Sequence, residues 1–122
     1  MTKILITEDD KFLSAAYNAK LTKAGFDTRV ATDGVMALDI LKSFTPELII
    51  LDLIMPLKDG FSVLEELAQN QQTSNIPVIV MTNLGQKEDI DRAMKLGAKD
   101  YVIKSDIDPN QLVAKINSLL GL

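Results

Sequence analysis

The sequence predicts an α/β protein in which five helices cover both sides of a doubly wound, five-stranded parallel sheet. Three observations predict this class. Short apolar stretches alternate five times with segments of helical periodicity. The connections between them are short, as in folds whose parallel strands are joined through helices. The stretches at residues 48–51 and 76–81 are almost wholly apolar, which is typical of strands buried on both faces.

The first half of the chain supplies two strands and two helices. Residues 2–7 form an apolar strand, and residues 26–31 alternate apolar and polar side chains, as an edge strand with one wet face does. Gly25 ends the helix between them, and Thr32-Asp33 can cap the next one. The apolar positions are Leu13, Ala16, Tyr17, Leu21 and Ala24 in the first helix, and Ala37, Leu38, Leu41 and Phe44 in the second.

The second half repeats the pattern after the buried strand at residues 48–51. A third helix, the strand at residues 76–81, a fourth helix and a short strand at residues 101–103 follow in turn. Asp108 and Pro109 are a helix cap and a first helical residue, so they mark the start of the last helix. The third helix is marked by Phe61, Leu64, Leu67 and Ala68, and one face of the fourth carries Ile90, Ala93, Met94 and Gly97. The expected buried face of the last helix consists of Leu112, Val113, Ile116, Leu119 and Leu120.

The polarity of the strands also predicts their order. The alternating second strand belongs at an edge, whereas the first, third and fourth strands are apolar enough for the middle. This gives the order 2-1-3-4-5 within a single domain, residues 1–122, with a switch point between the first and third strands. Ligands of such sheets bind beyond the carboxyl ends of the strands, so the residues that follow each strand are the candidates for function.

Composition excludes several classes of function. With 13 basic and 17 acidic residues the net charge is −4, so the basic surface of a nucleic-acid-binding protein is missing. No apolar run is long enough to span a membrane, and the N-terminal strand is too short for a signal peptide. The chain has no Cys and no His, which excludes disulfides, Ser-His or Cys-His catalysis and a phosphohistidine of its own. We therefore expect a cytoplasmic protein with neither nucleic acid nor membrane as a direct partner.

Polar side chains follow four of the five predicted strands. Glu8 and Asp9 follow the first, Asp52 the third, Thr82 the fourth and Lys104 the fifth. Three carboxylates at one edge repel one another unless a cation joins them, and Mg²⁺ is the simplest hard cation with oxygen ligands. Lysine and threonine can bind phosphoryl oxygens, and a carboxylate can be the nucleophile. Together these groups predict a site for phosphoryl transfer.

Each of these side chains also has a purely structural interpretation. The acidic run at residues 8–10 can cap the first helix, and Asp10 is expected to do only that. Thr82 could bond its own backbone, and Lys104 could be a solvated surface charge. The occurrence of all of them at strand ends favours the functional interpretation.

From end to end, the chain resembles the receiver domains of bacterial response regulators, the family that includes the chemotaxis response regulator. The stretches ILITEDD, LIILDLIMPLKDGF, VIVMTN and LGAKDYVIK carry the resemblance. It implies a flavodoxin-like fold and phosphorelay signalling, in which Asp52 accepts a phosphoryl group from a histidine kinase, a phosphotransfer protein or a small phosphodonor. It also implies that Glu8, Asp9, Asp52 and the backbone carbonyl of Ile54 hold Mg²⁺.

The resemblance further implies a switch. Thr82 corresponds to the switch hydroxyl, Tyr101 to the switch aromatic residue and Lys104 to the lysine of the site. The surface formed by the fourth helix, fifth strand and fifth helix would then change and contact a downstream protein. Such a domain is a phospho-acceptor that assists only its own phosphorylation and dephosphorylation, and is otherwise no enzyme.

Three positions depart from the family pattern. Glu8 replaces the commoner Asp and should leave metal binding intact. Asn83 stands where a small residue is usual, so it either crowds the phosphoryl site or adds a hydrogen bond. Ser105 replaces the usual proline. Because a cis bond costs about 3–4 kcal/mol before an ordinary residue but only about 0.5–1 kcal/mol before proline, we predict a trans Lys104-Ser105 bond.

Two neighbours of the site bear on the lifetime of a phosphoryl group. Ile54 and Leu84 resemble the family positions that flank the path of the attacking water. Both are apolar and cannot orient water as an acid or amide could. The sequence therefore predicts slow self-dephosphorylation.

Two other functions stay open. A flavodoxin-like cofactor binder would need a loop rich in Ser, Thr or Gly after the first strand, where residues 8–10 would instead repel phosphate without a metal. A receiver-shaped interaction module that is never phosphorylated would usually lack one of the five site residues, and all are present. Because no output domain follows Leu122, a stand-alone receiver and a receiver from a longer protein both stay possible.

Overall fold

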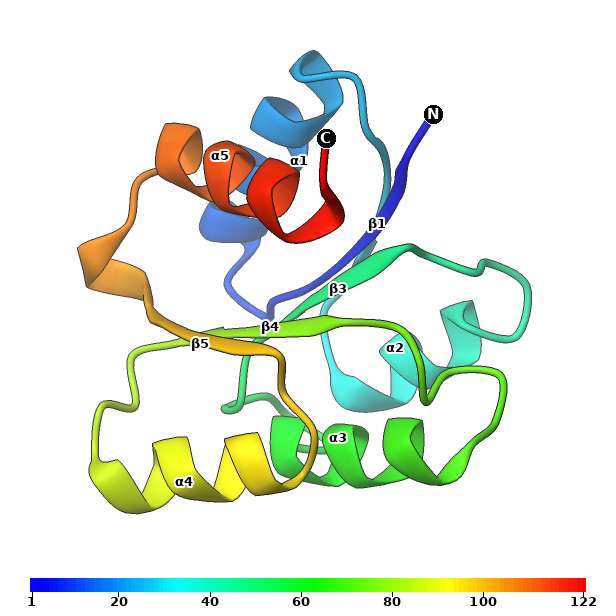
Figure 1. Cartoon of the computed structure of the whole chain (residues 1–122), viewed down its shortest axis with the longest axis vertical. Helices are drawn as coiled ribbons and strands as arrows, with labels where there is room; N and C mark the ends of the chain where they lie inside the picture. The colour runs from blue at the N-terminus through cyan, green and yellow to red at the C-terminus, as the bar shows by residue number, and fades with distance from the viewer.

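Five parallel strands form one sheet in the order β2-β1-β3-β4-β5, as predicted, in a computed structural model that describes residues 1–122. The strands are β1 (Lys3–Thr7), β2 (Asp27–Ala31), β3 (Leu48–Leu51), β4 (Val78–Thr82) and β5 (Asp100–Ile103). The helices are α1 (Lys11–Lys23), α2 (Gly34–Ile40), α3 (Gly60–Gln69), α4 (Lys87–Lys95) and α5 (Pro109–Leu120), with a 3-10 turn, η1 (Lys104–Asp106), before α5. Figure 1 shows α1 and α5 on one side of the sheet and α2, α3 and α4 on the other.

The sheet divides the core into two layers because side chains alternate along each strand. Leu5, Leu51 and Val80 point to the layer under α2, α3 and α4. Ile6 and Ile50 point to the layer under α1 and α5. All residues of β3 and β4 are buried, which confirms the prediction that both strands are covered on both faces.

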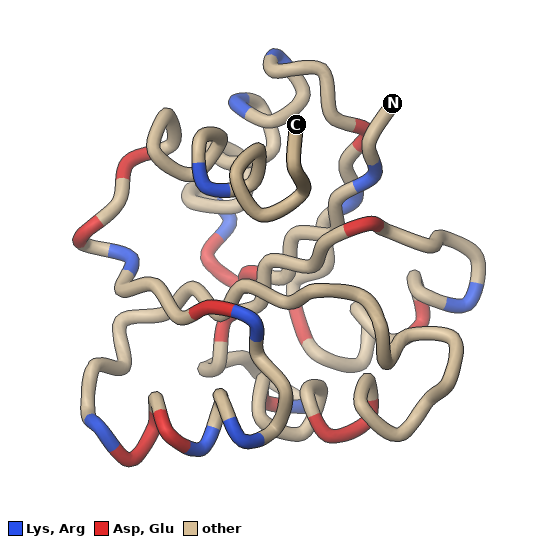
Figure 2. The backbone as a smooth tube through the Cα atoms, viewed as in Figure 1, with Lys and Arg blue, Asp and Glu red and all other residues tan.

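Aspartate side chains start four of the five helices. The carboxylates of Asp10, Asp33, Asp59 and Asp108 accept hydrogen bonds from backbone N–H groups of the first turn, at 2.7–3.0 Å. The predicted caps of α1, α2 and α5 are thus confirmed. The exception is α4, where Gln86 makes no capping bond. Figure 2 shows that charged residues occupy much of this helix.

The second helix is shorter than its apolar pattern predicts. It ends at Ile40, and the chain tightens into turns, with Ser43 N–H bonded to the Ile40 carbonyl. Leu41 and Phe44 therefore lie outside the helix, although Phe44 is still buried beneath Arg29. The apolar spacing shows which side chains are buried, and a residue in a turn, such as Phe44, can be buried as fully as one in a helix.

The buried face of α4 is also narrower than predicted. Ala93 is buried, but Met94 is 44% exposed and Gly97 lies beyond the helix with φ of +109°. In the last helix only Leu112 and Ile116 are buried, and the other predicted apolar positions are half-buried. Apolar spacing alone does not show how wide a stripe the neighbouring elements cover.

The chain after β5 accommodates a trans bond between Lys104 and Ser105. No peptide bond in the structure is cis, as predicted for this pair. Lys104, Ser105 and Asp106 form the single turn η1, which leads into the capped start of α5.

Candidate functional site

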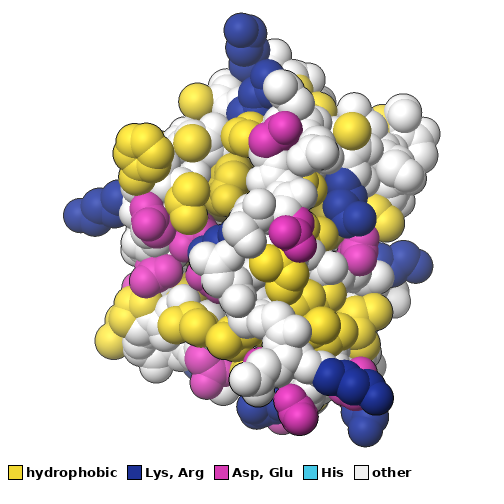
Figure 3. All heavy atoms as spheres, turned by 90° about the vertical axis from the view of Figure 1, so that its left-hand side faces the viewer, with side chains coloured by type: hydrophobic (Ala, Val, Ile, Leu, Met, Phe, Trp, Pro, Cys, Tyr) yellow, Lys and Arg dark blue, Asp and Glu magenta, His cyan; other side chains and the backbone are white.

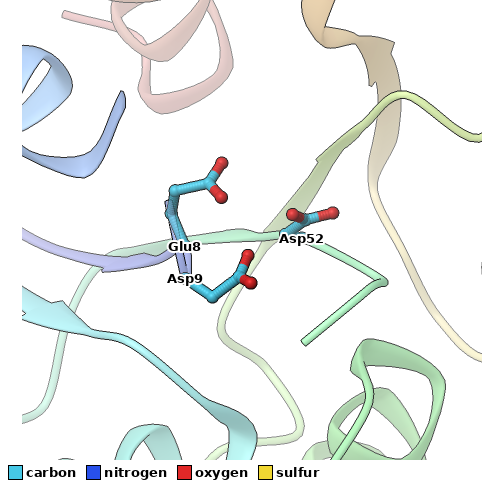
Figure 4. A group of neighbouring side chains, drawn as sticks. All are labelled: Glu8, Asp9 and Asp52. Atoms are coloured by element: carbon cyan, nitrogen blue, oxygen red, sulfur yellow. The ribbon is translucent and has the colours of Figure 1, made fainter. Parts of the chain in front are cut away.

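The carboxyl ends of four strands bring the predicted site residues to one edge of the sheet (Figures 1 and 3). Glu8 and Asp52 are 2% and 4% exposed, Thr82 is fully buried, and Asp9 is exposed to solvent. Oxygen atoms of the three carboxylates lie within 4.8 Å of one another. Figure 4 shows the three side chains facing a common space. Adjacent Glu8 and Asp9 thus form one acidic cluster with Asp52, which lies more than 40 positions further along the sequence.

Backbone hydrogen bonds hold the two buried carboxylate residues in place. The sheet ladder continues one residue past each strand, with Glu8 N–H bonded to Ala31 O and Asp52 N–H to Thr7 O, both at 3.0 Å. Gly60 brings the start of α3 against the same loop. A Cβ atom at Gly60 would lie 2.3 Å from the carbonyl oxygen of Asp52, so only glycine permits this approach. Nothing in the sequence pattern predicts this role of Gly60, which depends on how close α3 lies to Asp52.

Lys104 joins the two buried carboxylates. Its Nζ lies 2.7 Å from Oδ2 of Asp52 and 2.5 Å from Oε1 of Glu8. Burial works against the charged amine, but the bonds to Asp52 and Glu8 outweigh it and raise the pKa of Lys104. For Glu8, burial raises the pKa, and the hydrogen bond from Lys104 only partly offsets this rise. One lysine against three carboxylates leaves the site with excess negative charge.

This donor set fits a hard divalent cation. The cluster offers carboxylate oxygens only, and exposed Asp9 gives access from solvent. Asp10 N–H bonds Oε2 of Glu8 at 3.1 Å, and Ile54 N–H bonds Oδ1 of Asp52 at 3.3 Å, so each buried carboxylate is oriented by the backbone. Asp10 itself caps α1 and lies outside the cluster, as predicted.

Thr82 and Tyr101 converge on the loop between β4 and α4. Oγ1 of Thr82 accepts a hydrogen bond from Leu84 N–H at 3.4 Å, and the Tyr101 hydroxyl donates to the Leu84 carbonyl at 2.6 Å. Burial, with the negative charges of Asp89 and Asp52, raises the pKa of Tyr101. The Asn83 side chain is exposed and makes no hydrogen bond. The structure therefore links the two predicted switch residues through Leu84.

Exposed apolar side chains lie on elements that border the cluster. Phe12 at the start of α1 is 83% exposed, and Ile54 and Leu57 in the loop after Asp52 are 58% and 82% exposed. Figure 3 shows yellow apolar side chains beside the magenta carboxylates on this face. The largest hollow, about 720 Å³, lies elsewhere, between the ends of α2 and α3, and contains none of the predicted site residues.

Comparison with known proteins assigns the class. The family model of the response regulator receiver domain matches residues 4–117, so the chain belongs to that family. Its members are signalling domains that act as phospho-acceptors. This assignment confirms the resemblance seen in the sequence and sets aside the flavodoxin-like cofactor binder.

Particular relatives are transcriptional regulators. RpaA of Synechocystis, the DNA-binding dual master transcriptional regulator, is 37% identical over 120 residues, which are 98% of this chain and 49% of RpaA. CpxR of Klebsiella pneumoniae is 40% identical over 120 residues, 98% of this chain and 50% of that protein. The chain thus spans about half the length of the curated relatives it matches.

Solved structures agree with the family and the fold. The receiver domain of Francisella response regulator 1452 superposes with a TM-score of 0.87 and 33% identity, covering 98% of this chain and 96% of that one. The Mn²⁺-bound form of response regulator Rcp1 has a TM-score of 0.85 and 31% identity, covering 97% of this chain and 93% of that one.

None of the helices of this chain is long and apolar enough to cross a membrane.

Proposed function

We propose that residues 1–122 act as a receiver whose Asp52 accepts a phosphoryl group. The observation that carries this proposal is the contact of Lys104 with both Asp52 and Glu8, beside solvent-accessible Asp9. A carboxylate oxygen of Asp52 attacks phosphorus, the bond from phosphorus to the donor breaks, and its electron pair leaves with the donor. The product is a mixed anhydride on Asp52. Because residues 1–122 contain no His, the phosphohistidine lies outside them, on a kinase or phosphotransfer protein, or a small phosphodonor serves instead.

Glu8, Asp9, Asp52 and the backbone carbonyl of Ile54 are the groups that would hold Mg²⁺. When bound, the ion offsets the negative charge of the phosphoryl group and orients its oxygens. The Mn²⁺-bound form of its relative Rcp1 supports a divalent ion in this family. In this chain Lys104 already contacts two of the three carboxylates, so it can turn to a phosphoryl oxygen when Glu8 and Asp52 acquire another positive partner.

The phosphoryl group is expected to act on the β4–α4 loop. The Thr82 hydroxyl would leave Leu84 N–H and donate a hydrogen bond to a phosphoryl oxygen. Tyr101 would follow into the space that Thr82 leaves. The Tyr101–Leu84 hydrogen bond supports this coupling because it joins β5 to the same loop. The resulting change biases the surface of α4, β5 and α5, which we propose contacts a downstream protein in the cytoplasm.

Labelling with acetyl phosphate tests the acceptor. With Mg²⁺, the wild-type protein should gain one phosphoryl group by intact mass, and Asp52→Asn should gain none, because the amide keeps the shape but is no nucleophile. Asp10→Asn is the matched control: it changes a neighbouring carboxylate that caps α1, and it should be labelled like wild type. Labelling of Asp52→Asn at the wild-type level would contradict the proposal, and an unlabelled wild-type protein would favour the interaction module that is never phosphorylated.

The lifetime of the phosphoryl group provides a second test. Ile54 is 58% exposed and Leu84 is half-buried, and neither side chain can hold an attacking water. We expect Ile54→Asn with Leu84→Glu to speed hydrolysis, measured as the decay of the phosphoryl mass after the donor is removed. A decay rate equal to that of wild type would contradict the prediction.

A further inference from the structure

Leu57 is an apolar side chain that the backbone presents to solvent at a conformational cost. Its φ is +68°, in the left-handed region that favours glycine, and every other residue with a positive φ is a glycine. The N–H of Lys58 bonds the carbonyl of Pro56 at 2.7 Å, which closes a tight turn around Leu57. The Leu57 side chain is 82% exposed, so burial within the monomer does not offset this cost. Strain at an exposed residue points to a contact outside the monomer.

Leu57 forms one wall of a hollow of about 560 Å³ between α2 and the loop that follows β3. The α2 wall carries Val35 and Met36, which are 49% and 41% exposed, together with half-buried Leu38. These four apolar residues, Val35, Met36, Leu38 and Leu57, are called the Leu57 patch below. The patch thus contains both a projecting side chain and an apolar hollow beside it, and exposed apolar patches of this kind mark interaction sites.

The two walls of the hollow are held together before any partner binds. Gly34, at the start of α2, approaches the loop so closely that a Cβ atom there would lie 2.3 Å from the carbonyl oxygen of Lys58. The side chain of Lys58 pairs with Glu66 of α3, which lies beside α2 on one side of the sheet (Figure 1). A surface that is already ordered loses little conformational entropy when it associates.

The charges around the hollow are mixed and nearly balanced. They are carried by Lys42 and Lys58 on the positive side and by Asp33, Asp39 and Glu66 on the negative side. Such a rim does not select a strongly charged partner such as a nucleic acid or a polybasic peptide. A second copy turned about a two-fold axis presents the same cations and anions, so each sign can face the opposite one. It also presents a projecting Leu57 to the hollow, and a hollow to the projecting Leu57.

We propose that the Leu57 patch is the interface of a symmetric dimer of this chain, in which Leu57 of one copy enters the hollow of the other. A residue near a two-fold axis contacts its own counterpart, and Leu57 takes that place because it is both the projecting side chain and a wall of the hollow. This interface is separate from the α4, β5 and α5 surface, and its formation needs no phosphoryl group. Because few side chains take part, the association is weak.

Single cysteines test the contact, because the chain has none of its own. Under mild oxidation with copper phenanthroline, Leu57→Cys should form a disulfide with its counterpart and run as a dimer on a non-reducing gel. Phe12→Cys is the matched control, since Phe12 is 83% exposed but lies on α1, outside the patch. Met94→Cys places a thiol on α4, in the proposed output surface. Cross-linking of either control as strongly as Leu57→Cys would overturn the inference.

Analytical ultracentrifugation measures the association of the unmodified chain. The mass of wild type should rise toward that of a dimer as its concentration increases, and Phe12→Ala should behave alike. Leu57→Gly should weaken the dimer about tenfold or more, because it removes the projecting side chain. The same variant should raise the urea midpoint, because relief of the strained φ outweighs the entropy that glycine adds to the unfolded chain.

Opposite changes in association and in stability distinguish a residue kept for contact from one needed for folding. A wild-type protein that stays monomeric up to millimolar concentration would overturn the inference. So would a Leu57→Gly protein that associates as strongly as wild type.

Discussion

The two helices that flank β5 differ in how firmly they are capped and packed. The last helix, α5, has a capping box at Asp108 with Gln111, a proline in its first turn and Gly121 in the left-handed conformation at its end. Leu112 and Ile116 bury its inner face, and an ion pair of 2.7 Å between Lys115 and Asp100 joins it to β5. By contrast α4 has no side-chain cap and only one buried residue, Ala93.

The weak anchoring of α4 identifies it as the element that can move. Elements with few buried apolar contacts open at low free-energy cost, while those that share the core open only with the whole domain. Both helices belong to the proposed output surface, so a signal from the site would shift α4 against a fixed α5. A side chain of α4 also contacts α3, its neighbour on the same side of the sheet: the Arg92 guanidinium lies 4.1 Å from the centre of the Phe61 ring.

Truncation of the inner faces should show the largest difference. Leu112→Ala leaves a cavity at a site that is 1% exposed and should lower the free energy of unfolding by about 2–5 kcal/mol. Ile90→Ala, at a half-buried site on α4, should lower it by less than half as much. Urea unfolding measures both values. Equal losses would mean that α4 is as firmly packed as α5.

The helix caps provide the next test. Asp108→Ala removes the capping box and should cost about 0.5–2 kcal/mol, measured by urea unfolding. The opposite change, Gln86→Ser, gives α4 the cap that it lacks and should slow hydrogen exchange of its amides. Gln86→Ala is the control, with no slowing expected. If Gln86→Ser and Gln86→Ala exchange alike, the missing cap is not a cause of the weak anchoring of α4.

The Tyr101 hydroxyl should anchor the start of α4 in a pH-dependent way. Tyr101→Phe removes the bond to Leu84 O and should cost about 0.5–1.5 kcal/mol. Burial and the charges of Asp89 and Asp52 raise the pKa of Tyr101 in the folded protein above that of the unfolded chain. The contribution is therefore complete below the ordinary tyrosine pKa of about 10 and is lost as the pH rises through the folded value.

Unfolding measured at a series of pH values from neutral to alkaline checks this sign. The stability difference between wild type and Tyr101→Phe should stay constant up to about pH 10 and then shrink. A difference that grows with pH would contradict the expected direction.

The cation over Phe61 should give the smallest effect. Arg92→Met keeps the length of the side chain but removes its charge, and should cost about 0.5–1 kcal/mol while speeding hydrogen exchange in α4. Lys95→Met removes a charge from the same helix at a position without an aromatic partner and serves as the control. Equal exchange in the two variants would show that the Arg92–Phe61 contact does not hold α4.

Local patterns in the sequence determined the fold and its order. Fully apolar strands must lie in the middle of a parallel sheet and an alternating strand at its edge, so β3 and β4 could be placed from composition alone. The caps at Asp10, Asp33 and Asp108 were equally predictable, because a helix start depends on neighbours within three residues. The sequence also assigned Glu8, Asp52, Thr82 and Lys104 to one edge of the sheet, because the carboxyl ends of parallel strands meet there.

Only the tertiary structure decided how these groups meet. Lys104 pairs with Glu8 as well as Asp52, and the Tyr101 hydroxyl bonds the Leu84 carbonyl, so both contacts join segments that are distant in the sequence. The close approach of Gly60 to Asp52 depends on the path of the loop between them. The end of α2 at Ile40 and the exposure of Met94 also depend on what the neighbouring elements cover. Periodicity reports which side chains avoid water, whereas distances between separate elements follow from the packing of the whole chain.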